Sequence, residues 1–294
     1  FRSVTSDDLL REKTVIQYVE SHLSDWQKNG WLPDLKIESG DKTDEPIRTR
    51  GWTHWHHLFA PRQLLFLGLA SRNARSRNDD LVAPLLLYLA RTVDWSSKLC
   101  RYGTGAARES VAQTFYNQAL NTLYAYGVRS FFFAKTYFLE DPISRPIVTA
   151  CSVSCVPADT VSTPVDVFIT DPPYGDAVKY EEILEFFIAW LRKNPPPEFS
   201  NWKWDSRRAL AIKGEDDDFR RGMVAAYQRM TELMPDNGLQ IIMFTHQSGS
   251  IWADMANIVW ASGLHVTAAW YVVTETDSAL REGSYVKGTV LLVL

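Results

Sequence analysis

The stretch that decides the fold is residues 165–174, which read Val165-Asp166-Val167-Phe168-Ile169-Thr170-Asp171-Pro172-Pro173-Tyr174. The β-branched run over 165–170 is typical of a short buried strand. The two prolines fix a stiff turn after it, and they remove two backbone donors while leaving their carbonyls able to accept. The sequence therefore predicts a strand that ends in the carboxylate of Asp171, a fixed carbonyl and the ring of Tyr174.

This arrangement suits the binding of an aromatic amine. Ligands of open α/β sheets bind at the carboxyl ends of the strands. Two acceptors can take the two N–H groups of the amine, and a ring can stack on its plane. The alternative is a plain surface Asp-Pro-Pro turn. We favour the binding function because the string stands between a predicted buried strand and a helix predicted over 180–193.

Beyond this stretch the chain divides into two patterns. The first part is helical: Ser6 is a good N-cap and Gly30 a good stop for a first helix. Its predicted buried stripe is Leu9, Ile16, Val19, Leu23 and Trp26. Further helices are expected from Pro61 and over 79–99 and 107–126, while 130–139 is ambiguous. We therefore expect a helical region over 1–145.

The second region, 146–294, alternates strands with helices. The predicted strands are 165–170, 239–245, 265–274 and 288–294, and the predicted intervening helices are 180–193, 215–234 and 250–262. Such alternation implies an α/β fold with a mostly parallel sheet that helices cover.

Composition excludes several classes of protein. The 294 residues are 46% hydrophobic and carry a net charge of −4, which excludes intrinsic disorder and a polybasic chain. A nucleic-acid surface would have to be a local patch. Three cysteines cannot form a disulfide framework, which favours a reducing, cytoplasmic setting. No apolar run reaches the roughly 18 residues of a membrane span, so no membrane partner is expected. Because the chain opens on Phe1, we expect a fragment of a longer protein.

The motif at 171–174 resembles the catalytic motif of amino-methyltransferases, which methylate exocyclic amines with S-adenosylmethionine. The similarity extends to an uncharacterised family of adenine-specific DNA methylases. The segments that carry it are Trp55-His56-His57-Leu58-Phe59-Ala60-Pro61-Arg62-Gln63-Leu64-Leu65, Gly175-Asp176, Tyr180, Phe186-Phe187-Ile188-Ala189-Trp190-Leu191-Arg192, Phe244-Thr245-His246, Gly263 to Trp270, and Thr274-Glu275.

The resemblance implies a fold, an activity and partners. The fold would be part of a class I methyltransferase-like (Rossmann-like) sheet, mostly parallel with an antiparallel last strand. Residues 146–294 would be the catalytic methyltransferase half, and the helical region 1–145 an inserted or accessory part for target recognition. The activity would be site-specific, adenine-specific DNA methylation with S-adenosyl-L-methionine and no metal. Asp171 and the carbonyl of Pro172 would accept hydrogen bonds from the target amine, Pro173 would complete the turn, and Tyr174 would stack on an extruded base. The partners would be DNA and either a missing N-terminal segment or another subunit of a modification or phage-defence system.

The sequence departs from this family at the cofactor. No glycine-rich Phe-x-Gly-x-Gly loop follows a first strand; the nearest string, Gly103-Thr104-Gly105, has no strand before it. The family's second cofactor loop is reduced to Cys151-Ser152-Val153, so Ser152 and Asp171 are the cofactor-binding candidates. Either the first strands precede Phe1 or the site is degenerate. The alternatives are therefore a non-catalytic DNA-binding or assembly module, and an RNA or protein-amide methyltransferase. A protein-amide substrate is disfavoured because position 171 is Asp, whereas methyltransferases of protein amides usually have Asn there.

Two further groups have competing interpretations. The nucleic-acid-binding candidates are Tyr180, Trp202, Trp204, Arg207 and Arg208. A packed loop explains the tryptophans equally well. Arg72, Arg75 and Arg77 fit the carboxyl end of a helix better than a phosphate contact.

Two other groups do not predict a metal site. His54, His56 and His57 come from one short run, which rarely supplies three ligands of one metal, so aromatic packing with exposed imidazoles is expected. Cys151 and Cys155 have no second pair, which predicts buried thiols rather than a zinc ribbon.

Overall fold

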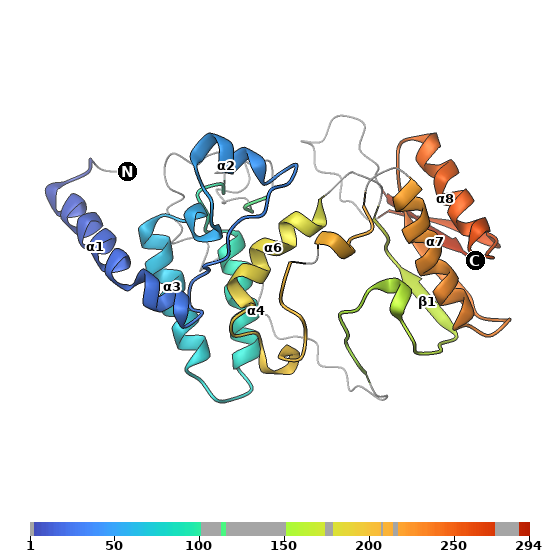
Figure 1. The fold of residues 1–294 in the computed structure, drawn as a ribbon, viewed down its shortest axis with the longest axis horizontal. Coiled ribbons are helices and arrows are strands. Elements are labelled where there is room, and N and C mark those ends of the chain that lie inside the picture. Colours follow the sequence, from blue (N-terminus) through green and yellow to red (C-terminus); the bar gives the residue numbers. More distant parts are fainter. Residues whose placement is uncertain are drawn as a thin grey trace. The chain divides into compact units, whose positions relative to one another are not determined.

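A computed structural model describes residues 3–100, 113–115, 151–173, 179–206, 208–213, 217–273 and 288–294 (Figure 1). The chain forms two compact units. Unit 1 comprises Phe1–Val153 and Glu181–Ser206, and unit 2 comprises Ser154–Tyr180 and Arg207–Leu294.

Unit 1 is helical in its described residues. Its elements are α1 (Ser6–Lys28), α2 (Asp44–Arg50), the 3-10 turn η1 (Trp55–Leu58), α3 (Pro61–Arg75), α4 (Val82–Asp94), α6 (Tyr180–Leu191, assigned to the unit from Glu181) and η3 (Pro197–Phe199). Pro61 opens α3, as the sequence predicts, because a first-turn residue needs no N–H donor. Gly30 follows α1 at φ 71°, a conformation that glycine adopts without steric cost.

The beginning of α1 differs from the prediction. Thr5, not Ser6, is the N-cap, and it forms a reciprocal capping box with Asp8. The predicted stripe is buried only toward the end of the helix: Val19 and Trp26 are buried, whereas Leu9 is 65% exposed. The first turns of α1 therefore extend beyond the core that the later turns reach.

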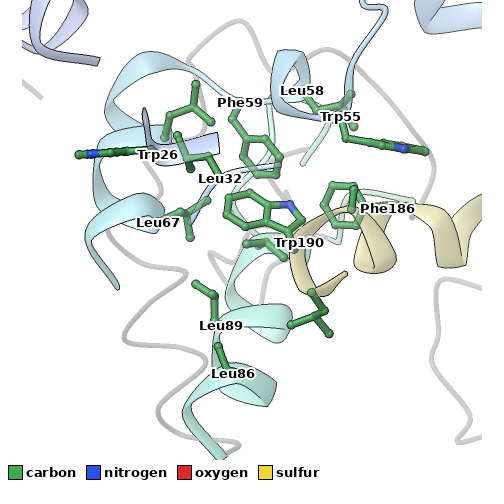
Figure 2. Packing of buried hydrophobic residues seen from close by; sticks show 14 of the residues in the cluster. Trp26, Leu32, Trp55, Leu58, Phe59, Leu67, Leu86, Leu89, Phe186 and Trp190 are labelled. Carbon is green, nitrogen blue, oxygen red and sulfur yellow. The ribbon is translucent and has the colours of Figure 1, made fainter. Parts of the chain in front are cut away.

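The core of unit 1 contains side chains from the segment 55–65 and from the helix α6. The rings of Trp55 and Phe186 meet edge to face at 5.8 Å, and Phe59 meets Trp190 in the same way at 5.2 Å. Figure 2 shows these side chains packed together, with Leu58 and Leu67 beside them. The segments 55–65 and 186–192 therefore make one hydrophobic core.

Hydrogen bonds hold both ends of α6 against the rest of unit 1. Glu182 is buried, and its carboxylate accepts from the backbone N–H groups of Lys42 and Thr43 at 2.9 and 3.0 Å. At the other end, the guanidinium of Arg75 donates to the carbonyl of Trp190 at 3.0 Å. The helix that follows the Asp171 turn thus packs with the helical unit. The sequence placed it in the second region, and the predicted boundary at 145/146 lies outside the described residues.

Unit 2 contains a four-stranded sheet. Its strands are β1 (Val167–Thr170), β2 (Leu239–Phe244), β3 (Ala268–Val273) and β4 (Gly288–Val293), in the order β1-β2-β4-β3. β1 pairs with β2 in parallel, while β4 runs antiparallel to β2 and to β3. The prediction of one sheet with a reversed last strand is confirmed. The other elements of the unit are η2 (Ala158–Thr160), η4 (Arg208–Leu210), α7 (Asp217–Glu232) and α8 (Gly249–Ala261).

The helices α7 and α8 cover one face of this sheet (Figure 1). Ile242 and Phe244 of β2 are buried there against both helices. The opposite face is apolar and exposed: Ile169 is 68% and Trp270 64% exposed. The strand register places both side chains on that face: Ile169 pairs with Ile241 and Trp270 with Leu291. These two partners precede the buried Ile242 and Leu292, which face the other way.

Several predicted elements lie outside the described residues. They are the helix over 107–126 except for 113–115, the segment 130–139, and the ends of the turn at 174–178 and of the strand at 274.

Candidate functional site

Asp171 follows the carboxyl end of strand β1, as the sequence predicts. The strand itself differs from the prediction: it begins at Val167, and it is a partly exposed edge strand of the described sheet rather than a buried one. The strand ends at Thr170, and Asp171 follows as an exposed residue. Pro172 and Pro173 come next and are half-buried. Since β1 pairs in parallel with β2, the carboxyl ends of both strands meet at the same edge of the sheet. The carboxylate therefore lies where ligands of α/β sheets bind.

Tyr227 is a site residue that the sequence analysis missed. It comes from α7, and its hydroxyl lies 3.3 Å from the Thr170 hydroxyl, next to Asp171 along β1. Burial raises the pKa of Tyr227 to about 12, the hydrogen bond with Thr170 lowers it, and the charge of Asp171 raises it. The phenol therefore stays protonated at neutral pH. Its helical spacing with Phe219, Met223 and Met230 indicates a core position, so the sequence carried no separate signal.

The carboxyl end of β2 adds His246 to this edge of the sheet. The backbone N–H of Ser248 donates to Nδ1 of His246 at 2.9 Å, so the proton of the neutral ring is on Nε2. The indole of Trp252 donates to the His246 carbonyl at 2.9 Å, and its ring meets Phe244 edge to face at 4.9 Å. These contacts fix the turn that carries the imidazole.

The remaining residues of the motif are only partly described. Tyr174 and the pair Gly175-Asp176 lie outside the described residues. Tyr180 opens α6 and is 53% exposed, as a surface contact residue would be. Ser152 lies in an exposed irregular segment of unit 1, whereas Asp171 belongs to unit 2.

The candidate nucleic-acid residues are divided between the two units. Trp202 and Trp204 stack at 6.2 Å in unit 1, where the Trp204 indole donates to the Phe199 carbonyl at 3.0 Å. Both tryptophans are half-buried, which fits the packed-loop interpretation and leaves part of each ring accessible. Arg208 is buried in unit 2, and Arg207 lies outside the described residues.

The arginines at the end of α3 have structural partners. Arg75 donates to the carbonyl of Trp190, Arg77 pairs with Asp79, and the Arg72 guanidinium lies 5.3 Å from the ring centre of Trp31. The helix-end interpretation is therefore supported by contacts.

Cofactor and metal chemistry find little support in the described residues. Where the residues that follow a strand are described, they do not form a glycine-rich loop. These residues therefore do not fit the methionine part of S-adenosylmethionine. In the same part of the chain, no group of three or more His, Cys, Asp or Glu side chains could hold a metal ion.

The cysteines differ from the prediction. Cys151 and Cys155 are exposed rather than buried, because the irregular segment that carries them lies outside both hydrophobic cores. Cys100 is the buried thiol, and burial raises its pKa.

The described helices include none that is both long and apolar enough to cross a membrane. Comparisons of the chain with protein-family models, with curated proteins and with solved structures found no match.

Proposed function

We propose that this chain carries the substrate-binding half of an S-adenosylmethionine-dependent methyltransferase that acts on the exocyclic amine of adenine in DNA. The observation that carries the proposal is the exposed carboxylate of Asp171, followed by two prolines, at the carboxyl end of β1. The reversed strand β4 between β2 and β3 supports it, because the resemblance to methyltransferases implies an antiparallel strand there.

In this proposal Asp171 and the carbonyl of Pro172 each accept one N–H of the adenine amine. Two acceptors in the plane of the amine leave its lone pair directed out of that plane, toward the methyl donor. This is a task of positioning and electrostatics that needs no covalent enzyme intermediate. Tyr174 stacks on the base, which has to leave the duplex before its amine can enter such a site.

The described residues do not supply the cofactor side of this proposed site. β1 is an edge strand of the described sheet, and its outward residues Val167 and Ile169 are exposed. The sheet therefore has an open edge and an open apolar face next to Asp171. We place the cofactor-binding strands and helices on that side.

The test uses the protein expressed from its complete gene. Methyl transfer from labelled S-adenosylmethionine is measured on unmethylated DNA, on RNA and on protein, and nucleoside analysis identifies the product. We expect N6-methyladenine in DNA, and its loss in Asp171→Ala. The matched control is Asp166→Ala, since Asp166 is an exposed carboxylate just before the amino end of the same strand.

Methylation of RNA or protein alone would replace the substrate in this proposal. Absence of both methylation and S-adenosylmethionine binding, measured by calorimetry, would indicate the non-catalytic DNA-binding or assembly module instead.

A further inference from the structure

A cluster of three imidazoles and one ammonium group lies in unit 1, apart from Asp171 in the sequence and in a different unit. The ring centres of His54, His56 and His57 are 4.3 to 5.6 Å apart. The backbone N–H of Lys98 donates to the Leu58 carbonyl at 2.7 Å. This bond ties the segment after α4 to the end of η1, and the charge of Lys98 lowers the pKa of both His56 and His57.

Two of the imidazoles present N–H donors even when they are neutral. Nδ1 of His57 accepts the backbone N–H of Thr53 at 3.1 Å. Nδ1 of His56 accepts from the Gln27 side-chain amide nitrogen at 3.2 Å, and that nitrogen also donates to the Pro33 carbonyl. Because Nδ1 is the acceptor in both rings, the proton of each neutral ring is on Nε2. Neither Nε2 has a hydrogen-bond partner among the described residues.

Lys98 adds a positive charge that no carboxylate balances within the described part of the chain. Its ammonium lies 4.4 Å from the ring centre of Trp52, and no described Asp or Glu pairs with it. Burial lowers its pKa to about 8, so it is largely protonated at pH 7. The same cluster has an unfavourable charge balance: burial together with the charges of His57, His54 and Lys98 lowers the pKa of His56 to about 4.

The nearby carboxylate is already engaged. Asp34 raises the pKa of His56, but it forms ion pairs with Arg192 and Lys193. The pKa of Asp34 is lowered by these two partners in spite of its burial, which raises it. The cluster therefore offers hydrogen-bond donors and positive charge, and it lacks a free anion to neutralise them.

We propose that Lys98, His56 and His57 form a binding site for a phosphate group. A phosphate has enough acceptor oxygens for the ammonium and for both Nε2–H groups. All three side chains are half-buried, which leaves them partly accessible while weakening competition from water. A metal cation would be repelled by Lys98. The phosphate can belong to a small phosphate ester or to a nucleic-acid backbone, and the chemistry of the site is the same for both.

Phosphate binding and the protonation of the histidines are coupled, and this coupling provides the signal to measure. An anion bound at the cluster favours the protonated imidazoles, so phosphate has to raise the pKa values of His56 and His57. The chain has six histidines, so their ring C–H signals can be resolved and assigned by NMR. His265 is exposed in unit 2 and serves as an internal control.

The experiment titrates the chain with inorganic phosphate near pH 7, against chloride at matched ionic strength. We expect saturable shifts of the His56 and His57 signals and none of His265. Lys98→Gln should weaken binding at least about tenfold, as expected when a charged hydrogen bond is lost. Lys98→Arg should retain binding, which also controls for folding. Lys203→Gln, at an exposed lysine of the same unit, should change nothing.

A second arm uses a single-stranded thymidine oligonucleotide in place of phosphate. Tighter binding that Lys98→Gln abolishes would assign the site to a nucleic-acid backbone. Binding of phosphate alone would assign it to a small phosphate ester. Absence of saturable shifts with either ligand, or equal affinity in Lys98→Gln, would overturn the inference. It does not rest on the proposed methyltransferase activity, so either can fail alone.

Discussion

Replacing Phe186 with alanine tests whether α6 is held by the core of unit 1. Phe186 is fully buried and belongs to the helix that follows the Asp171 turn. Its ring contacts Trp55, Phe59, Phe115 and Phe187 at centroid distances of 5.8, 5.9, 5.3 and 5.2 Å. Removing the ring therefore empties the centre of an aromatic cluster.

The expected loss is large. A buried Phe→Ala substitution costs about 3–5 kcal/mol of the free energy of unfolding. Four aromatic partners place this position in the middle or upper part of that range, since each pair contributes about 0.5–1.5 kcal/mol beyond burial. We therefore expect a loss of about 4 kcal/mol. With an m-value of about 2 kcal/mol/M, the urea midpoint of unit 1 should fall by about 2 M.

The assay is urea unfolding followed by far-ultraviolet circular dichroism and tryptophan fluorescence. The matched control is Leu184→Ala, because Leu184 lies in the same helix and is 54% exposed. It should change the unfolding free energy by no more than about 0.5 kcal/mol. A loss below about 1 kcal/mol for Phe186→Ala, or equal losses for both variants, would refute the packing of α6 described here.

Three further predictions concern pH, the cofactor and the base. Burial raises the pKa of Asp94 to about 6, above the ordinary 3.8, while Arg91 and the Thr114 N–H lower it. The protonated carboxyl group therefore stabilises the fold at low pH, and this contribution is lost as the pH rises from about 4 through 6. In Asp94→Asn the free energy of unfolding should change less with pH over that interval. The 294-residue chain should bind S-adenosylmethionine weakly or not at all, and a micromolar dissociation constant from calorimetry would contradict this. In the complete protein Tyr174→Ala should weaken base capture by about 1–3 kcal/mol while cofactor affinity is unchanged, and Tyr174→Phe should retain most activity.

Local sequence patterns predicted the elements of unit 2 well. The strand that ends at Asp171 has a short β-branched run and a proline stop, and both act within a few residues. The direction of β4 followed from the resemblance rather than from the residues of the strand itself. The helix α6 was also predicted, but its partner was not, because an apolar stripe does not specify which core it joins. Only the contacts of Phe186 and Trp190 with Trp55 and Phe59 show this.

The same limit applies to the candidate site. Asp171 was predicted because a carboxylate before two prolines is a rare local string. Tyr227 was not, because a tyrosine in a buried helical stripe looks the same whether or not its hydroxyl reaches a neighbouring strand. The exposure of Cys151 and Cys155 depends on where an irregular segment runs, which hydrophobicity does not determine. Long-range packing therefore accounts for most of what the sequence did not predict.

The measurement that tests the central claim most directly is methyl incorporation into unmethylated DNA by the complete protein, with Asp171→Ala and Asp166→Ala compared side by side. We expect N6-methyladenine in the reaction with Asp166→Ala and none with Asp171→Ala, while both variants unfold at nearly the same urea concentration. Full methylation by Asp171→Ala would contradict it, because the Asp-Pro-Pro string would then be a structural turn and not the site that binds the amine.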